Sequence, residues 1–243
     1  MRRRYSTFFI TFVGKINVMN KIIFSLLFLF LPCVSYAQSM QALRDSLKVA
    51  TDELAYHPDS IDLRIKKVAW NIQLEQWNYA KDDLDKVLFL DNQNVAGLYY
   101  RAFVNTKLGR YKFARLDYQN LLTLVPGNFN GLLGLALLNQ KDKHYTEALD
   151  EINRLVSQYP DSAVAYAARG GIEKERGFLE LALEDYTQAM KREPRNHDFI
   201  LNRIDLLIRL KRKKEAKDEL DRLVKMGVNR GELMELYGAL RAK

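Results

Sequence analysis

Alanine recurs at a fixed interval of 34 residues along most of this chain. Five alanines follow one another without a gap: Ala80, Ala114, Ala148, Ala182 and Ala216. Proline keeps the same interval at four places: Pro58, Pro126, Pro160 and Pro194. An unbroken repeat of this length is typical of solenoids, in which each repeat packs mainly on its neighbours. The sequence therefore predicts one continuous array and not several separate domains.

The second repeat shows how each of them is expected to fold. The pattern predicts a first helix over residues 95–108, a tight turn, and a second helix over residues 111–124. Gly109 can adopt the left-handed conformation that ends the first helix, and Pro126 cannot continue the second. Ala114 stands where the two helices are expected to approach closely. A larger side chain there would cost about 1–3 kcal/mol through overpacking.

This pattern resembles the tetratricopeptide repeat family. Counting each repeat from residues 61, 95, 129, 163 and 197, alanine occupies position 20 in all five. Gly109 and Gly177 supply the family's glycine at position 15, whereas Glu75, Lys143 and Lys211 depart from it. The resemblance implies an all-α fold, a right-handed superhelical solenoid of antiparallel helix pairs that binds other proteins. Its five repeats would span residues 61–94, 95–128, 129–162, 163–196 and 197–230.

Half-repeats are expected at both ends of the array. Residues 38–60 align with a lone second helix, and residues 231–243 align with a lone first helix. Such capping helices would cover the apolar faces that a stack of repeats otherwise exposes. The side chains expected to face the stack from the C-terminal helix are Leu233, Leu236, Tyr237 and Leu240.

The first 37 residues have the three parts of a secretory signal peptide. Lys21 precedes an apolar run at residues 22–31, and the small-residue pattern that ends at Ala37 follows it. We expect cleavage after Ala37 and export, most simply to a bacterial periplasm, with Met19 as an alternative start. The other interpretation is an uncleaved membrane anchor, although the run is about half the length that spans a bilayer. Membrane contact is expected only through this segment.

Cleavage would also remove the only cysteine, Cys33. Lipid attachment at Cys33 stays open but is disfavoured, because Pro32 stands where a small residue is preferred. The mature chain would then have no disulfide and no thiolate for zinc. The formal net charge is +8, and the first 37 residues carry five basic side chains and no acidic one, which leaves +3. We expect no nucleic-acid partner from so small an excess.

No residue pattern in the sequence indicates catalysis. The three histidines, His57, His144 and His197, map to repeat boundaries or turns and lie far apart in the sequence. A glycine-rich phosphate loop and the zinc-protease and hydrolase motifs are absent. The sequence therefore predicts a protein that is not an enzyme and that uses no cofactor and no metal.

Opposite charges recur at repeat positions 7 and 23. We expect ion pairs between the first and second helix of four repeats: Lys67 with Asp83, Arg101 with Asp117, Arg169 with Asp185, and Arg203 with Glu219. The third repeat breaks the pattern with Leu135 opposite Glu151. The alternative is that these are unrelated surface charges. Exposed pairs would each contribute about 0.2–1 kcal/mol.

The first helices should line the inner, concave face of the solenoid. Side chains at repeat positions 2, 5, 9 and 12 share one face of each first helix, and basic residues flank them at position 13. The partner-binding groove predicted in this way contains Ile65, Tyr99, Tyr100, Phe103, Lys107, Leu133, Leu137, Lys141 and Arg209. It would suit a helix or extended peptide with apolar anchors and some acidic residues. The alternative is that Tyr99 and Phe103 pack against a neighbouring helix.

These patterns together predict a non-catalytic scaffold of the bacterial cell envelope that holds a partner protein in its concave groove. The alternative is a structural component that associates with copies of itself, as a homo-oligomer. The sequence identifies neither the partner nor the pathway.

Overall fold

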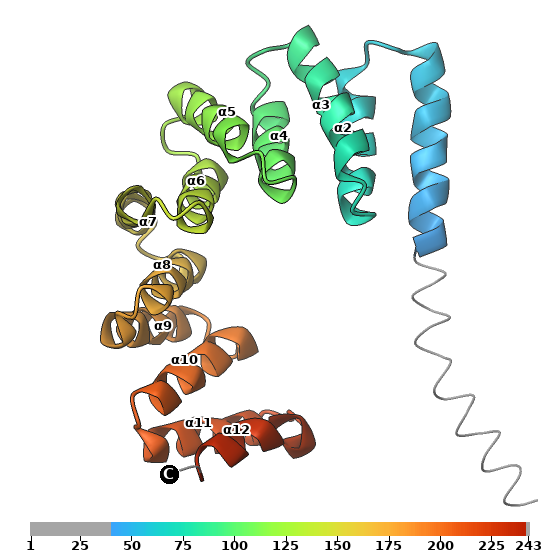
Figure 1. The fold of residues 1–243 in the computed structure, drawn as a ribbon. Helices are drawn as coiled ribbons and strands as arrows, with labels where there is room; N and C mark the ends of the chain where they lie inside the picture. Colours follow the sequence, from blue (N-terminus) through green and yellow to red (C-terminus); the bar gives the residue numbers. More distant parts are fainter. Residues whose placement is uncertain (1–39, 242–243) are drawn as a thin grey trace, which may run out of the picture. The chain divides into compact units, whose positions relative to one another are not determined.

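The computed structural model describes residues 40–241, and every regular element in that range is helical (Figure 1). The first helix spans residues 40–56. The others are α2 (Ile61–Gln73), α3 (Trp77–Leu90), α4 (Val95–Lys107), α5 (Tyr111–Leu124), α6 (Phe129–Lys141), α7 (Tyr145–Gln158), α8 (Ala163–Glu175), α9 (Leu179–Arg192), α10 (His197–Arg209), α11 (Lys213–Lys225), η1 (Arg230–Leu233) and α12 (Met234–Ala239). The predicted signal peptide, its cleavage site and Cys33 lie outside the described residues.

The chain divides into two compact parts at a boundary inside α3, between Asp83 and Leu84. Of the described residues, 40–83 form the N-terminal part and 84–241 the C-terminal part. The sequence predicts one continuous array instead. A solenoid allows such a division because each repeat contacts mainly its neighbours and no single core ties distant repeats together. Each part buries apolar residues of its own, such as Leu54 and Val68 in the first and Leu121 and Ile204 in the second.

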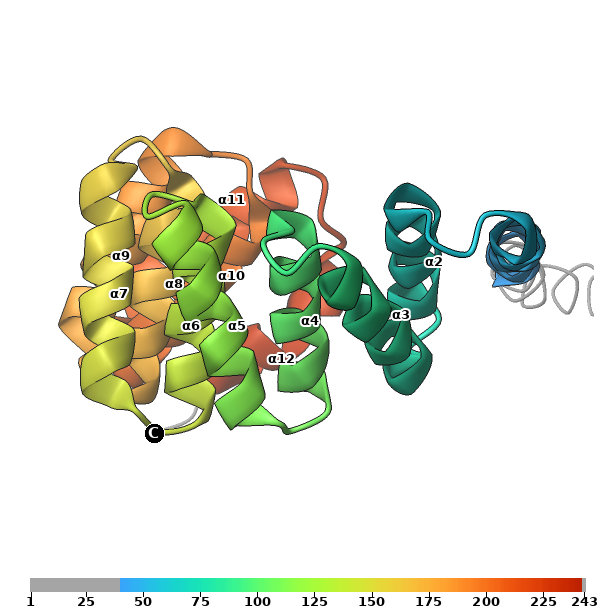
Figure 2. The same cartoon turned by 90° about the horizontal axis from the view of Figure 1, so that it is seen from above.

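Within the C-terminal part, the helices pack as the consecutive pairs α4/α5, α6/α7, α8/α9 and α10/α11. Figure 1 shows α4, α6, α8 and α10 along the inner side of this part, and Figure 2 shows the same helices from above. Contacts also join α4 to α6 and α6 to α8. The all-α fold of packed helix pairs that the sequence predicts is confirmed.

A polar side chain caps the start of every first helix, at repeat position 34 of the preceding repeat. The five caps are Ser60, Asn94, Asn128, Ser162 and Asn196, and each accepts a hydrogen bond from a backbone N–H in the first turn. These caps explain why the first helices begin at residues 61, 95, 129, 163 and 197, since each satisfies a donor that the helix itself leaves free.

A left-handed residue ends every first helix. Positive φ angles occur at position 15 of all five repeats: Glu75 (55°), Gly109 (72°), Lys143 (63°), Gly177 (81°) and Lys211 (59°). The turn geometry therefore stays the same in the three repeats that lack the family's glycine. A side chain with a Cβ costs about 1–2 kcal/mol in this conformation, so the packing of the two helices fixes the turn more strongly than local preference does.

Each pair of helices meets at the recurrent alanine. All five alanines at repeat position 20 are fully buried. In the fourth repeat, a Cβ added at Gly170 would lie 3.2 Å from the backbone oxygen of Ala182 and 3.1 Å from the ring of Tyr186. In this repeat, the first helix thus comes within contact distance of the backbone of the second.

The four predicted ion pairs all join the two helices of one repeat. Arg101 binds Asp117 through two bonds, Nε to Oδ2 at 2.9 Å and Nη2 to Oδ1 at 2.7 Å. Arg169 holds Asp185 in the same way at 2.7 and 2.8 Å. Lys67 Nζ lies 3.0 Å from Asp83 Oδ2, and Arg203 contacts Glu219.

Three of these four carboxylates, Asp83, Asp117 and Asp185, are buried, which changes the expected contribution of their pairs. Only 1% of Asp117 and 3% of Asp185 is exposed to solvent. A buried carboxylate depends on its counter-charge, so removing the cation costs far more than breaking a surface pair does. In the third repeat, Leu135 is buried opposite Glu151, and burial raises the pKa of Glu151.

Repeat position 11 carries a second series of buried polar side chains. Asn71, Asn105 and Asn139 occupy this position in the first three repeats, and Glu173 takes it in the fourth. Glu173 faces Asp185 across the helix pair, and its Oε2 atom has no hydrogen-bond partner. Burial, and then the negative charge of Asp185, raise the pKa of Glu173 to about 7; Glu184 acts in the same direction and Arg169 in the opposite one.

The C-terminal half-repeat differs from its prediction. The sequence predicts one capping helix over residues 231–243, whereas the structure has the 3-10 turn η1 followed by the six-residue α12. Asn229 accepts a hydrogen bond from Gly231 N at 2.8 Å, and Glu232 N donates to Asn229 O at 3.0 Å, which tightens this start into a 3-10 turn. The side chains expected to face the stack do pack against it, with Leu233 and Tyr237 buried and Leu236 and Leu240 partly buried.

We expect Arg101→Met to lower the free energy of unfolding by about 3–5 kcal/mol, because it leaves Asp117 buried without a counter-charge. Chemical denaturation would measure the change. Arg110→Met, at an exposed position nearby, is the matched control and should stay within about 0.5 kcal/mol of the parent chain. Adding Asp117→Leu to Arg101→Met should recover most of the loss. Equal effects of Arg101→Met and Arg110→Met would contradict the role assigned to this pair.

We expect the stability of the chain to depend on the protonation of Glu173. The pKa of this carboxyl lies above its ordinary value of 4.5 in the folded chain, so the protonated form favours folding. Its stabilisation is complete below pH 4.5, decreases as the pH rises, and is lost above pH 7. Glu173→Gln should therefore stabilise the chain relative to the parent by about 1–3 kcal/mol more at pH 8 than at pH 4.5. Denaturation at both pH values, with Glu175→Gln as the exposed control on the same helix, tests this; a pH-independent difference would refute it.

Candidate functional site

The inner side of the C-terminal part has a hollow between α4 and α6, with a volume of about 300 Å³. Four residues of α4 line one wall, and six residues of α6 line the other. Tyr118 of α5 closes the floor. The lining residues are Tyr99, Phe103, Thr106, Lys107, Tyr118, Asn130, Leu133, Gly134, Leu137, Leu138 and Lys141. We call this feature the α4–α6 hollow.

The depth of the hollow depends on a glycine opposite a tyrosine. A Cβ added at Gly134 would lie 2.5 Å from the ring of Tyr118, so only glycine leaves room for that ring. Tyr118 is buried, and its ring centroid lies 6.4 Å from that of Tyr99. The two tyrosines form an aromatic surface beneath and beside the opening, of the kind that anchors partner side chains in protein interfaces.

The hydroxyl groups of this aromatic surface stay uncharged at neutral pH. Burial raises the pKa of Tyr118, and the neighbouring Tyr99 and Asp117 add to the effect. Burial and then Tyr100 raise the pKa of Tyr99. The floor of the hollow is therefore apolar and neutral, and formal charge is confined to its rim.

Two lysines stand at the rim. Lys107 Nζ lies 5.4 Å from the centre of the Phe103 ring, and Lys141 Nζ lies 5.9 Å from the centre of the Tyr111 ring. Both lysines are exposed, and 43% of Leu137 is exposed beside them. An aromatic and aliphatic surface flanked by two cations can hold an apolar side chain and a neighbouring carboxylate.

The structure brings together six of the nine residues in the predicted groove. They are Tyr99, Phe103, Lys107, Leu133, Leu137 and Lys141. Tyr99 also packs against the core cluster of the helix pairs, as the alternative interpretation of its side chain expects.

The other three predicted residues do not line this hollow. Tyr100 is partly buried, with its ring 5.3 Å from that of Tyr99. Arg209 is two first helices away on α10, where its Nε lies 3.1 Å from Asp205. Ile65 lies on α2 in the N-terminal part.

Sequence reasoning missed the residues that shape the floor. Neither Tyr118 nor Gly134 is among the groove residues predicted from the sequence. A signal was present, because glycine at position 6 occurs in the third repeat alone and follows a repeat with tyrosine at position 24. Their contact depends on how one repeat stacks on the next, which spacing within a single repeat does not give.

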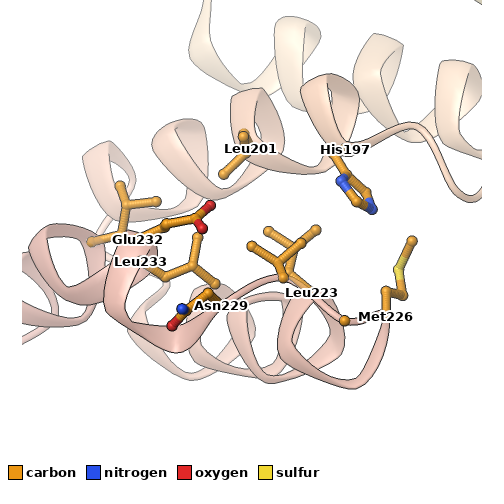
Figure 3. Close-up of a pocket in the computed structure, with 10 residues that line it drawn as sticks. His197, Leu201, Leu223, Met226, Asn229, Glu232 and Leu233 are labelled. Carbon is orange, nitrogen blue, oxygen red and sulfur yellow. The ribbon is translucent and has the colours of Figure 1, made fainter. Parts of the chain in front are cut away.

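A second hollow, of about 570 Å³, lies where the C-terminal half-repeat begins. Figure 3 shows His197 and Leu201 of α10 facing Leu223, Met226 and the η1 segment with Glu232. It forms because a 3-10 turn and a short helix stand where a full first helix would otherwise pack. Its wall mixes one histidine, one carboxylate and several aliphatic side chains, and it lacks the aromatic floor of the α4–α6 hollow.

Among residues 40–241, no cluster of three or more His, Cys, Asp or Glu side chains has an arrangement that could hold a metal ion. The helices of that same range are also too short or too polar to cross a lipid bilayer.

Several solved structures resemble this arrangement of helices. A tetratricopeptide repeat protein from Parabacteroides merdae superposes with a TM-score of 0.68 over 84% of this chain and 80% of its own, at 20% identity. The chain has the tetratricopeptide-repeat fold. A structure of Pseudomonas aeruginosa pilF aligns with a TM-score of 0.62 over 72% of this chain and 80% of its own, at 19% identity.

The structure of YrrB, described as a tetratricopeptide-repeat protein, aligns with a TM-score of 0.57 over 81% of this chain and all of its own, at 18% identity. YrrB is described as having an unusual peptide-binding site. No family model and no curated protein matches the sequence. At identities of 20% and below, the three likenesses establish the fold and leave the partner to be argued from the residues.

Proposed function

We propose that this chain is a non-catalytic scaffold of the bacterial cell envelope that holds a partner protein in the α4–α6 hollow. The single observation that carries the proposal is the aromatic floor of Tyr99 and Tyr118 beneath an open rim with two lysines. A hollow of about 300 Å³ matches one or two partner side chains better than a large cofactor.

The chemistry of the hollow indicates the kind of partner segment. An apolar anchor would lie against Phe103, Leu133 and the tyrosine floor, and an acidic residue beside it would face Lys107 or Lys141. Exposed apolar area such as Leu137 beside the rim extends the contact along α6. A helix or an extended peptide can present residues in this way. The peptide-binding site of YrrB, on the same fold, supports this use of the solenoid.

The proposed location rests on the N-terminal sequence alone. Residues 1–37 have the charged start, apolar run and small-residue end of a signal peptide. Export would leave Gln38 as the first residue, and mass spectrometry of the protein recovered from the envelope would identify that end. An intact N-terminus at Met1 or Met19 would favour the membrane-anchored alternative.

A photo-crosslinking amino acid at Leu137 tests the groove directly. We expect it to capture a discrete partner in the cell, because Leu137 is exposed at the rim. The same probe at Leu181, an exposed apolar position on α9, is the matched control and should not capture that partner. Tyr99→Ala with Phe103→Ala should reduce the Leu137 adduct about tenfold or more, since losing two aromatic anchors removes several kcal/mol of contact. An adduct that the double substitution leaves unchanged would refute binding in the hollow.

Self-association is the second candidate function, and the outward face of α5 favours it. Phe113 is 64% exposed and Leu116 is 54% exposed one turn further along the helix. The exposed positions that follow, Gln119, Asn120 and Thr123, are uncharged. Such a face can meet a copy of itself about a twofold axis without like-charge repulsion. Light scattering that finds a monomer at all concentrations would exclude this alternative.

A further inference from the structure

A basic cavity of about 460 Å³ lies at the end of the helix array, away from the residues of the α4–α6 hollow. Three lysines come from the first two turns of α11, and one arginine comes from each side of α12. Two side chains of low polarity complete the lining. The seven residues are Lys213, Lys214, Lys217, Arg230, Tyr237, Leu240 and Arg241. We call this feature the terminal basic cavity.

The repeat pattern shows that this cavity departs from the rest of the chain. Position 17 is apolar or aromatic in the first four repeats: Trp77, Tyr111, Tyr145 and Leu179. In the second repeat, that residue, Tyr111, packs against the helix core and lies beside Lys141 of the next first helix. In the fifth repeat the residue is Lys213, with lysines also at positions 18 and 21. A position that elsewhere packs against the next repeat has thus become cationic where the next helix is short.

Hydrogen bonds and a ring contact hold some of the lining side chains in place. Asp221 accepts hydrogen bonds from Lys217 Nζ at 2.6 Å and from the Tyr237 hydroxyl at 2.7 Å. Arg230 stacks on the Tyr237 ring, with its guanidinium carbon 4.9 Å from the ring centre. Lys217 and Tyr237 hold the pKa of Asp221 below its ordinary value, and the charge of Arg230 adds to this. Tyr237 and Arg230 are therefore held in place beside the opening.

We propose that the terminal basic cavity binds a segment of a partner protein that carries several carboxylates around one apolar side chain. The carboxylates would pair with Lys214, Arg230 and Arg241, and the apolar side chain would lie on Tyr237 and Leu240. The seven lining residues include five cations and no carboxylate, and the neighbouring Asp221 neutralises Lys217, so the cavity keeps a net positive charge.

The geometry favours such a segment over a phosphate-rich ligand or a membrane surface. The lysines come from α11, and the arginines, Tyr237 and Leu240 come from the segment of η1 and α12, so both elements supply cations and the second also supplies apolar contact. Tyr237 and Leu240 would contact an apolar side chain, which a phosphate backbone and a lipid headgroup lack.

Fluorescence anisotropy with the full chain provides the test. The probe is a fluorescein-labelled peptide of eight glutamates interrupted by one central leucine, and we expect saturable binding that weakens as sodium chloride increases. Lys214→Glu with Arg230→Glu should weaken binding about tenfold or more, because two charge-assisted contacts become repulsive. Lys112→Glu with Lys191→Glu gives the same change in net charge at exposed positions outside the cavity and should change binding less than about twofold.

Two further measurements test whether the peptide binds in the terminal basic cavity and not elsewhere on the chain. Tyr99→Ala with Phe103→Ala should leave the binding of this peptide unchanged, which separates the terminal basic cavity from the α4–α6 hollow. A benzophenone on the peptide should crosslink the parent chain within residues 213–241, and this readout needs no substitution. Equal weakening by both charge-reversal pairs, crosslinks elsewhere, or binding of phosphatidylserine vesicles or inorganic phosphate in place of the peptide would overturn the proposal. Absence of saturable binding would show that these lysines only keep the end of the array soluble.

Discussion

The two helices of each repeat approach so closely that only alanine fits between them at repeat position 20. Every one of these alanines is fully buried, and in the fourth repeat a Cβ added at the facing Gly170 would lie only 3.2 Å from the backbone oxygen of Ala182. This contact fixes how the two helices of a pair are oriented. The ion pair from repeat position 23, three residues after the alanine, holds a side chain of the second helix to one of the first, as Asp117 is held by Arg101. The stacking of pairs, and therefore the surface that the first helices present, follows from this approach.

Much of this architecture can be predicted from the sequence, because a 34-residue period repeats the same contacts. The helix pairs, the small residues between them, the four ion pairs and six residues of the α4–α6 hollow can all be read from spacing. Features that arise between repeats cannot. The floor of the hollow forms because the ring of Tyr118 contacts the backbone of Gly134 in the next repeat. The left-handed turn at Lys143 is imposed by the packing of the two helices, although lysine itself disfavours that conformation. The 3-10 turn at η1 likewise depends on a local cap at Asn229.

We assign the proposed binding sites and the pH response to positions where a repeat departs from the common pattern. Gly134 opens a hollow at a position where other repeats carry a side chain. Lys213 replaces an apolar residue where the array ends. Glu173 replaces asparagine in a buried series, and its raised pKa makes one helix pair respond to pH. A scaffold of regular repeats can accommodate such changes one at a time, since each repeat contacts mainly its neighbours.

Substitution at a buried alanine tests the close approach of the helices most directly. Ala182→Leu should lower the free energy of unfolding by about 1–3 kcal/mol, because the added side chain overpacks the contact with Gly170. The neighbouring Leu181→Ala, at an exposed position of the same helix, should change it by less than about 0.5 kcal/mol. Urea denaturation of both variants beside the parent chain would measure this difference. An Ala182→Leu chain as stable as the parent would show that the helices of a repeat are not held together by this contact.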